Sequence, residues 1–269
     1  MRLPALFIGH GSPMNAIENT PYSQAWQQLG QQLRQQFGGH IRTILAISAH
    51  WLTDGIAVTA MPEPRTIHDF GGFPQALYEA TYPAPGNPQL AAHIQQLLSP
   101  LPVTADQSWG LDHGTWSILA HLFPEADIPV VQLSLNARYG AQQHIELAQK
   151  LAGLREEGVL IMASGNIVHN LRTLDFAHID QASPGYPWAE NIRRTVNQWL
   201  ADDNLEALGN DAAYPADMRQ AAPTPEHFWP LLYIAGVRQE GEQPQLFCDD
   251  IVGKSLSMTS VAYGLPANA

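Results

Sequence analysis

The sequence predicts an α/β fold, in which a single domain has a central mixed, largely parallel sheet with helices on both faces. Short strands alternate with helical patterns along the chain, and the strands are apolar throughout rather than alternately apolar and polar. No repeat of fixed period, low-complexity tract or linker interrupts the 269 residues. We therefore expect one domain over residues 1–269.

Short apolar runs bounded by turn residues are typical of strands. They cover residues 5–9, 43–48, 56–60, 128–135, 159–164 and 255–264. Only a short connection separates the second run from the third, so we expect the third strand to be antiparallel. The last run alternates in part between apolar and polar residues and is expected to end the chain on the sheet.

Helical spacing of apolar residues lies between these runs. In residues 22–37, Trp26, Leu29 and Leu33 recur at helical intervals. In residues 87–100 a proline stands near the expected helix start and another just past its end, as helix boundaries favour. Further helices are predicted over 114–123, 141–158 and 186–203.

Composition excludes several classes of function. The net charge is −12, from 25 acidic and 13 basic residues, which argues against binding to nucleic acid or to an anionic membrane. The single cysteine, Cys248, excludes an internal disulfide and a cysteine-rich zinc site. The first residues lack the features of a signal peptide, and no run reaches the ~18–20 apolar residues of a membrane span. We expect a soluble, cytoplasmic protein.

Histidines are unusually frequent, with 11 against 13 lysines and arginines. Three of them follow apolar strands: His10 after residues 5–9, His50 after 43–48 and His169 after 159–164. Ligands in open α/β sheets bind at the carboxyl ends of the strands. If these strands are parallel neighbours, the three imidazoles meet in one crevice.

Other histidines lie in loops with suggestive neighbours. Asp112 and His113 stand between glycines and tryptophans, Glu226 and His227 follow two prolines, and His68 precedes the loop residues Asp69-Phe70-Gly71-Gly72. Packing of aromatic-rich loops is the competing interpretation of each. The histidines in helical patterns, in turns and in a polar loop are set aside: His40, His93, His121, His144 and His178. Nucleotide-binding glycine motifs and the hydrolase motif G-x-S-x-G are absent.

Several motifs together resemble a known family. In chain order they are ALFIGHGSPM, ISAHW, IHDFGGFP, YPAPG, WGLDHGTW, PVVQLSL, SGNIVHNL, PTPEHFWPLLY and SLSMTSVAYG. They are similar to the DOPA-dioxygenase type of class III extradiol ring-cleaving dioxygenases, in the superfamily of the protocatechuate 4,5-dioxygenase catalytic subunit. The resemblance covers nearly the whole chain. It implies a single catalytic domain that opens a catechol ring, DOPA or a related substituted catechol, with O₂ to give a muconic semialdehyde.

The resemblance also implies roles for individual residues. His10, His50 and His227 are expected to bind the metal, which is Fe(II) for catalysis, with Zn(II) able to occupy the same site. His169 is expected to act as a base, as a fourth ligand, or as both. His113 is expected to act as an acid–base group beside O₂.

Further residues complete the expected site. Asp112 and His68 are expected to contact the substrate, with Arg172 as the candidate clamp for a substrate carboxylate. Ser48 and Asn166 are candidates for orienting histidines through hydrogen bonds, and packing at a turn is the competing interpretation. A monomer or small homo-oligomer is expected.

Some alternatives remain open at this point. The wider superfamily binds iron with two histidines and a carboxylate, so Glu226 competes with His227 as a ligand. A zinc-dependent hydrolase is one alternative function, because several imidazoles can hold a zinc-bound water. A metal-binding protein without turnover on the same scaffold is another.

Overall fold

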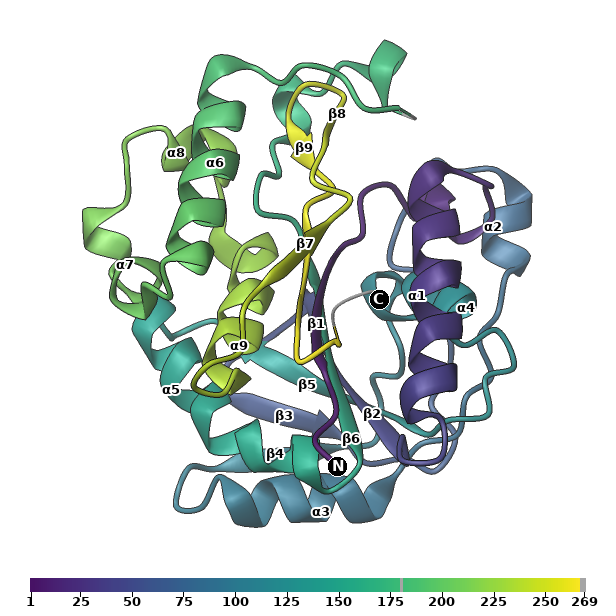
Figure 1. Cartoon of the computed structure of the whole chain (residues 1–269). Coiled ribbons are helices and arrows are strands. Elements are labelled where there is room, and N and C mark those ends of the chain that lie inside the picture. Colours follow the sequence, from purple (N-terminus) through teal and green to yellow (C-terminus); the bar gives the residue numbers. More distant parts are fainter. Residues whose placement is uncertain (180, 267–269) are drawn as a thin grey trace.

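In a computed structural model of the chain, residues 1–179 and 181–266 are described. Within these residues one eight-stranded sheet has the order β4-β3-β5-β2-β6-β1-β10-β7, and β8 and β9 form a separate pair (Figure 1). The strands are β1 (Ala5–Gly9), β2 (Thr43–Thr53), β3 (Ile56–Thr59), β4 (Val103–Asp106), β5 (Val130–Asn136), β6 (Val159–Gly165), β7 (Gln245–Phe247), β8 (Ile251–Val252), β9 (Leu256–Ser257) and β10 (Ser260–Tyr263).

The centre of the sheet is parallel and its edges are mixed. Strands β5, β2, β6 and β1 run in the same direction, whereas β10 is antiparallel to β1 and β7 is antiparallel to β10. Strand β3 is antiparallel to β5, with β4 parallel beside it. The predicted fold class is confirmed. A single catalytic domain over residues 1–269 stays a prediction, and residues 180 and 267–269 lie outside the described residues.

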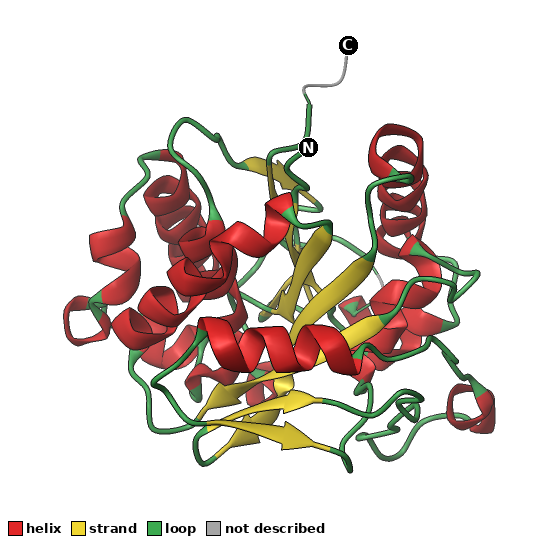
Figure 2. Ribbon diagram, turned by 90° about the horizontal axis from the view of Figure 1, so that it is seen from below, coloured by secondary structure: helices red, strands yellow, loops and turns green. Residues whose placement is uncertain are grey.

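Helices cover both faces of the sheet, as seen from below in Figure 2. Helices α1 and α4 pack together on one face, and α5 and α9 pack together on the other. The described helices are α1 (Pro21–Phe37), α2 (Gln75–Glu79), α3 (Pro88–Leu97), α4 (His113–Leu122), α5 (Ala141–Leu151), α6 (Pro187–Ala201), α7 (Leu205–Gly209), α8 (Met218–Ala221) and α9 (Trp229–Val237). No described helix is long and apolar enough to span a lipid bilayer.

Strand β1 shows why the strands are apolar throughout. Successive side chains of a strand point to opposite faces of the sheet. Leu6 and Ile8 belong to the core on the α1 and α4 side, whereas Ala5 and Phe7 belong to the core on the α5 and α9 side. Both faces of the sheet are therefore buried, as the uniformly apolar strands predicted.

Two strands differ most from their predicted bounds. Strand β2 continues to Thr53, so His50 lies within the strand rather than in a turn after it. The predicted strand 255–264 is divided into β9 and β10, which belong to different sheets. The Ser257 hydroxyl accepts a hydrogen bond from the backbone N–H of Thr259 (3.2 Å), and this local turn interrupts the extended chain.

The predicted helix 141–158 is also shorter than expected. Helix α5 ends at Leu151, and residues 152–156 continue as a 3₁₀ turn. Gly153 lies in this turn, where a glycine disfavours the regular helix. Strands β4 and β7 and helices α2, α7, α8 and α9 were not predicted as elements.

His144 on α5 is buried among aromatic side chains, and its burial gives stability a pH dependence. Its Nδ1 lies 3.1 Å from the Tyr233 hydroxyl, and its ring packs against Trp229. Burial lowers the pKa of His144 to about 4. The unfolded chain binds a proton near the ordinary pKa of about 6.5. The unfolding free energy of the folded protein should therefore fall as the pH drops from about 6.5 to about 4.

Urea unfolding of wild-type protein and of His144→Gln at pH 7.5 and pH 5 measures this contribution. Other buried histidines add to the total pH dependence, so the informative quantity is the difference between the two proteins. We expect the loss of unfolding free energy on acidification to be smaller in His144→Gln, by on the order of 1–2 kcal/mol. Equal losses in both proteins would contradict the assignment.

Candidate active site

Three of the predicted histidines lie at the carboxyl ends of the central strands. His10 follows β1, His50 lies near the end of β2, and His169 follows β6. Strand β6 pairs in parallel with both β1 and β2, so these ends lie side by side. The crevice expected from the sequence therefore forms at this end of the sheet.

His10, His50 and His227 form a compact group of ring nitrogens. One ring nitrogen of each lies within 4.8 Å of the corresponding nitrogen of the other two. The Nε2 atoms of His10 and His50 are 3.2 Å apart. The Nε2 atom of His227 is buried and has no hydrogen-bond partner within the described part of the chain. The arrangement brings three potential donor atoms to one point.

The other ring nitrogen, Nδ1, lies against an oxygen atom in each of these histidines. Nδ1 of His10 is 2.9 Å from Ser164 Oγ, that of His50 is 3.4 Å from Asp69 Oδ2, and that of His227 is 3.3 Å from Glu226 Oε1. An oxygen acceptor at Nδ1 favours the tautomer with its proton there, which leaves the Nε2 lone pair free. Metal-binding histidines usually have such a partner.

Burial keeps these imidazoles neutral. Burial first, and then the charges of the neighbouring histidines, hold the pKa of His10 and of His227 well below the usual value. The same causes lower the pKa of His50 to about 3, against the opposing effect of Asp69. These imidazoles are neutral, and their lone pairs face one another. One of the lone pairs is on a buried nitrogen that has no hydrogen-bond partner among the described residues. Such a set of donor atoms fits a divalent metal ion.

His169 lies beside this group rather than within it. Its ring stacks on that of His227, with centroids 3.5 Å apart and an angle of 4° between the planes. Its backbone N–H donates to Ala221 O (2.7 Å), which fixes the position of the loop after β6. Burial lowers the pKa of His169 to about 4, so its ring is neutral at pH 7.

His113 approaches the same group from the first turn of α4. Its ring centroid is 3.9 Å from that of His50. Its Nδ1 lies 3.0 Å from Asp69 Oδ1, and the same oxygen accepts the backbone N–H of His113 at 2.9 Å. Burial alone would raise the pKa of Asp69, but its contacts with His113 outweigh burial and hold that pKa below the usual value. Asp69 therefore bridges two imidazoles as a carboxylate.

Two glycines allow the backbone to approach closely behind these rings. A Cβ atom on Gly165 would lie 2.2 Å from the carbonyl oxygen of His227. A Cβ atom on Gly114 would lie 2.6 Å from Ser48 Oγ and 2.8 Å from His50 Cδ2. Hydrogen in place of Cβ thus lets the His227 segment and the start of α4 pack against the strand ends.

A cavity of about 500 Å³ opens over the histidine group. Its described lining combines five imidazoles and Asp69 with nine apolar side chains. The lining residues are His10, Gly11, Ser12, Pro13, Met14, His50, Asp69, Phe70, Phe73, His113, His169, Leu171, Leu174, Phe176, Ile179, His227 and Leu256. The size is within the range of ~300–1,000 Å³ that is typical of small-molecule sites.

The three residues predicted to contact substrate are not among these described lining residues. Asp112 is fully buried, where its carboxylate caps α4 by accepting the N–H of Thr115 at 3.1 Å. The Nε2 atom of His68 lies 2.8 Å from Ala80 O, and its ring packs against Trp116. Arg172 is exposed on the 3₁₀ turn of residues 171–173.

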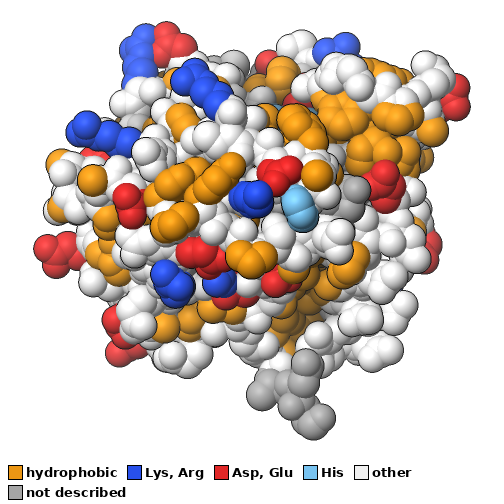
Figure 3. Space-filling view, turned by 90° about the horizontal axis from the view of Figure 1, so that it is seen from above, with side chains coloured by type: hydrophobic (Ala, Val, Ile, Leu, Met, Phe, Trp, Pro, Cys, Tyr) orange, Lys and Arg blue, Asp and Glu red, His pale blue; other side chains and the backbone are white. Residues whose placement is uncertain are grey.

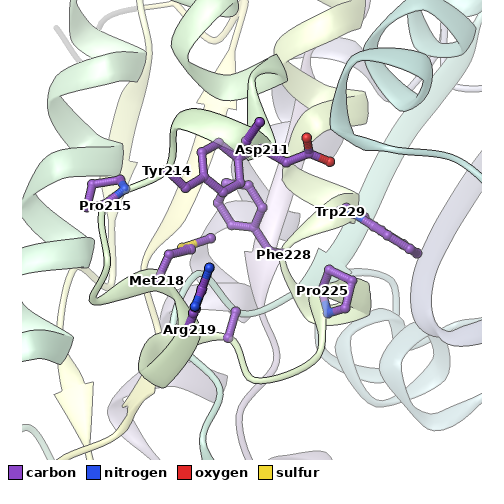
Figure 4. Close-up of a pocket in the computed structure, with 10 residues that line it drawn as sticks. Asp211, Tyr214, Pro215, Met218, Arg219, Pro225, Phe228 and Trp229 are labelled. Atoms are coloured by element: carbon purple, nitrogen blue, oxygen red, sulfur yellow. The ribbon is translucent and has the colours of Figure 1, made fainter.

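A second cavity, of about 220 Å³, is lined in part by Pro225, Phe228 and Trp229, which are close to His227 in sequence. Figure 4 shows the rings of Tyr214 and Phe228 together at its centre, with Arg219 beneath them. The two rings meet edge to face, with centroids 5.8 Å apart. None of its described lining residues is a histidine, so it lacks the donor set of the first cavity.

Some residues of the site were not identified from the sequence. Asp69 was noted only as a neighbour of His68, although it stands directly before Phe70-Gly71-Gly72 in the same loop. Ser164 contacts His10 and pairs in register with Ser48, and both are polar residues at the ends of apolar strands. Asn166 was singled out from the sequence; its backbone N–H donates to the carbonyl oxygen of His227 at 2.8 Å, and its side-chain amide donates to Ser257 O at 2.7 Å.

Comparisons with known proteins agree with this geometry. Residues 4–262 match the model of the family described as the catalytic LigB subunit of aromatic ring-opening dioxygenase. The chain therefore belongs to the LigB family. As a member, it is an extradiol ring-opening dioxygenase that acts on a catechol ring with O₂ and depends on a metal.

Relatives of this LigB-family chain extend over nearly its whole length. It is 47% identical to the 4,5-DOPA dioxygenase extradiol of Escherichia coli (strain K12), over 98% of this chain and 95% of the relative. It is 36% identical to the protein of the same name from Beta vulgaris, over 96% of this chain and 95% of the relative. The crystal structure of an uncharacterized protein from Escherichia coli K12 matches with a TM-score of 0.80 and 41% identity, and covers 98% of this chain and 100% of that one.

The LigB-family assignment confirms the predicted family and reaction class. Neither alternative, the zinc-dependent hydrolase nor the metal-binding protein without turnover, is supported by these matches. The structure groups His227, not Glu226, with His10 and His50. Glu226 instead lies against Nδ1 of His227.

Replacing Asp69 with asparagine should weaken the metal site of this LigB-family enzyme. Asparagine keeps an oxygen for the backbone N–H of His113 but removes the negative charge beside Nδ1 of His50. We expect metal affinity to fall by about 10–100-fold, as is usual when the partner of a ligand is lost. Competition with a chelator measures it. The control is Asp127→Asn, which removes a carboxylate paired with Arg34 at the surface; equal affinities of the two variants would contradict the role of Asp69.

Proposed function

We propose that the chain is a Fe(II)-dependent enzyme whose metal is held by His10, His50 and His227, and whose substrate is DOPA or a related substituted catechol. The observation that carries this proposal is the three-histidine group, in which each Nδ1 lies against an oxygen and one ring nitrogen of each histidine meets the others. DOPA enters because curated relatives at 47% and 36% identity are named 4,5-DOPA dioxygenase extradiol.

The reaction class favours Fe(II) over Zn(II). Three imidazoles suit either ion, so the donor set alone does not separate them. Zinc has no redox chemistry, whereas the family reaction uses O₂. When bound, the metal supplies Lewis acidity and a template that orients the two hydroxyls of the catechol and O₂. Zn(II) is expected to occupy the same histidines without supporting turnover.

His169 is proposed as the base that receives a catechol proton. A catechol held at the three-histidine group would place a hydroxyl oxygen beside His169, because the His169 ring lies directly against His227. The ring is neutral at pH 7, so it has a lone pair available for the proton. The other predicted role of this ring, as a fourth ligand, stays a prediction.

His113 is proposed as the proton donor on the other side of the cavity. Its Nδ1 faces Asp69, so Nε2 is the atom that presents a proton to the reacting oxygen. Asp69 Oδ1 lies against both this Nδ1 and the backbone N–H of His113, which holds the ring in this orientation. Phe70 and Phe73 line the cavity beside it and limit the access of water. The expected product is a muconic semialdehyde.

Metal exchange tests this proposal. Protein stripped of metal is loaded without oxygen with Fe(II) or with Zn(II), and then receives a catechol and air. With Fe(II) we expect oxygen uptake and a yellow semialdehyde, and with Zn(II) neither. Absence of oxygen uptake by the Fe(II)-loaded protein with every catechol tested would refute the proposal. A cytoplasmic location and a monomeric or small homo-oligomeric state stay predictions.

A further inference from the structure

We propose that Asp112 is a positioning residue. Its buried carboxylate joins the start of α4, which carries His113, to the end of β2, which carries His50, and thereby sets how the two imidazoles lie at the metal site. The proposal rests on the proposed function, which makes His50 a metal ligand and His113 a proton donor. Asp112 is not among the described residues that line the cavity, so it acts through these two histidines rather than on the substrate.

The rings of His50 and His113 lie largely below the surface of the protein. Figure 3 looks down on the end of the molecule where the central strands finish, and little histidine surface is visible there. The side chain of His50 is 18% exposed and that of His113 is 6% exposed. Their ring centroids are 3.9 Å apart, so a small shift of either segment changes how the rings meet. Buried groups behind the two rings therefore determine their positions.

The Asp112 carboxylate holds the start of α4. Asp112 is the N-cap residue of this helix, whose first residue is His113. Its Oδ1 accepts the backbone N–H of Thr115 at 3.1 Å, and its Oδ2 accepts a hydrogen bond from the side-chain amide of Gln132. A hydrogen bond from the N-cap side chain fixes the first turn of a helix. The carboxylate therefore fixes the direction in which the His113 side chain leaves α4.

Gln132 anchors Asp112 to the sheet. This residue lies on β5, and its backbone N–H donates to Thr59 Oγ1 on β3 at 2.8 Å. Its side-chain oxygen accepts the backbone N–H of Asp112 at 3.4 Å and the hydroxyl of Thr115 at 3.1 Å. Asp112, Thr115 and Gln132 are fully buried. Buried polar groups that hydrogen-bond to one another form a rigid network, so α4 begins at a fixed point against β5.

Ser48 extends the same network to His50. The pairing of β2 with β6 ends at Ser48, and its pairing with β5 shifts register between Ile47 and Leu52. His50 lies in this irregular stretch, and its backbone N–H donates to Ser48 Oγ at 3.2 Å. The Ser48 hydroxyl in turn hydrogen-bonds to the Asp112 carboxylate. Irregular stretches of a strand re-aim side chains next to active sites, so the orientation of His50 depends on this hydroxyl.

The start of α4 also lies directly against the strand ends. A Cβ atom on Gly114 would lie 2.6 Å from Ser48 Oγ and 3.2 Å from Ser164 Oγ. Ser164 Oγ is the atom that lies 2.9 Å from Nδ1 of His10. A shift of the first turn of α4 would therefore displace both hydroxyls, and through them the rings of His50 and His10.

A helix cap without a role in the metal site is the competing explanation, and α3 supplies a matched control. Helices α3 and α4 both have 10 residues. Asn87 caps α3 as Asp112 caps α4, because its side chain accepts the backbone N–H of Leu90 at 3.0 Å. Asn87 is not among the described lining residues of the cavity. Asn87→Ala should therefore destabilise the fold without changing the metal site.

Co(II) is a suitable probe because its visible absorption depends on the geometry of its ligands. Wild-type protein, Asp112→Ala and Asn87→Ala are loaded with Co(II), and competition with a chelator gives the Kd of each. In Asp112→Ala we expect a changed spectrum and a Kd raised by at least about tenfold, as when other partners behind a ligand are lost. Asn87→Ala should keep the wild-type Kd and spectrum although its Tm falls. A wild-type Kd and spectrum in Asp112→Ala would make Asp112 a helix cap only and would overturn the proposal.

Asp112→Asn is a milder variant that keeps the test open if the alanine variant does not fold. Thr115, Gln132 and Ser48 all donate to the carboxylate, so the amide nitrogen of asparagine must face one of these donors and lose that contact. With the Fe(II)-loaded enzyme we expect kcat to fall by about 10–100-fold and the KM for catechol to stay close to that of the wild type. A change in KM alone would place Asp112 on the substrate and would overturn the proposal.

Ser48→Ala tests the connection to His50 while it leaves the cap of α4 in place. Both substitutions act through the same contact, so the double variant Asp112→Asn/Ser48→Ala should raise the Kd for Co(II) by less than the product of the two single effects. Effects that simply multiply would overturn the connection between α4 and β2.

The same measurements separate the proposal from the proposed function. If the Fe(II)-loaded wild type consumes no catechol while Asp112→Ala and Asp112→Asn alter the Co(II) spectrum, the proposed function fails and the positioning role stands. If catechols are consumed and both variants have the wild-type spectrum and Kd, the positioning role fails alone.

Discussion

Replacing His227 with alanine should abolish stoichiometric metal binding and reduce kcat/KM by more than about a hundredfold. Loss of a hydrogen-bond partner behind a ligand already costs 10–100-fold in affinity or activity, so loss of the ligand itself should cost more. His227 is 6% exposed and supplies a buried Nε2 without a hydrogen-bond partner within the described residues. Its removal leaves only the two imidazoles of the remaining ligands, which are too few to hold the metal ion firmly.

Metal analysis after gel filtration, together with oxygen uptake, measures this effect. The control is His93→Ala, because His93 is a surface histidine whose Nε2 lies 2.9 Å from Glu157. It should keep the metal content and activity of the wild type. Wild-type metal affinity in His227→Ala would show that the ion is bound elsewhere, and Glu226→Gln then identifies whether the carboxylate is the ligand.

Replacing His169 with alanine should have the second largest effect, but a different one. We expect turnover to be nearly abolished while most of the metal stays bound, because His169 stacks on His227 and lies outside the group of three ring nitrogens. The base contributes typically 10²–10⁴-fold, so kcat should fall within that range. Metal content separates this result from that of His227→Ala.

Measurement of kcat at higher pH provides a second test of the role of His169 as a base. Hydroxide removes the catechol proton in place of the missing base, so His169→Ala should regain part of its kcat as the pH rises, whereas His227→Ala should not. Complete loss of metal in His169→Ala would make His169 primarily a ligand, and the histidine-only site would then have four donors.

Much of the site followed from where the strands end. His10 and His50 were located correctly because each follows an apolar run, and parallel neighbours bring such positions together. His227 could not be placed in this way. It reaches the strand ends through a short 3₁₀ turn and a close contact with Gly165, which depend on tertiary packing rather than on local sequence.

The separate roles of adjacent residues were harder to predict from the sequence, because the side chains of sequence neighbours point in different directions. Asp112 and His113 are consecutive, yet the Asp112 carboxylate turns back to cap α4 and the His113 ring faces the cavity. Leu171 lines the cavity, whereas Arg172, the next residue of the same 3₁₀ turn, is exposed and is not among the described lining residues. A sequence pattern places such residues near a site without giving their orientation.

Edge strands were missed for a different reason. The edge strand β4, with sequence VTAD, is only partly buried, and β7, with sequence QLF, lies at the opposite edge and is likewise exposed in part. Neither has the continuous apolar pattern of the central strands, because an edge has less surface to bury. The central strands, which position the histidines, carried the strongest pattern and were predicted best.

The position of the bound metal tests the account most directly, because two groups of side chains in the described part of the chain could hold an ion. One is His10, His50 and His227, and the other is His50, Asp69 and His113. Anomalous X-ray scattering from crystals of the Fe(II)-loaded protein locates the ion. We predict a single peak bounded by ring nitrogens of His10, His50 and His227, with His169 beside it. A peak between Asp69 and His113, away from His10 and His227, would contradict the account.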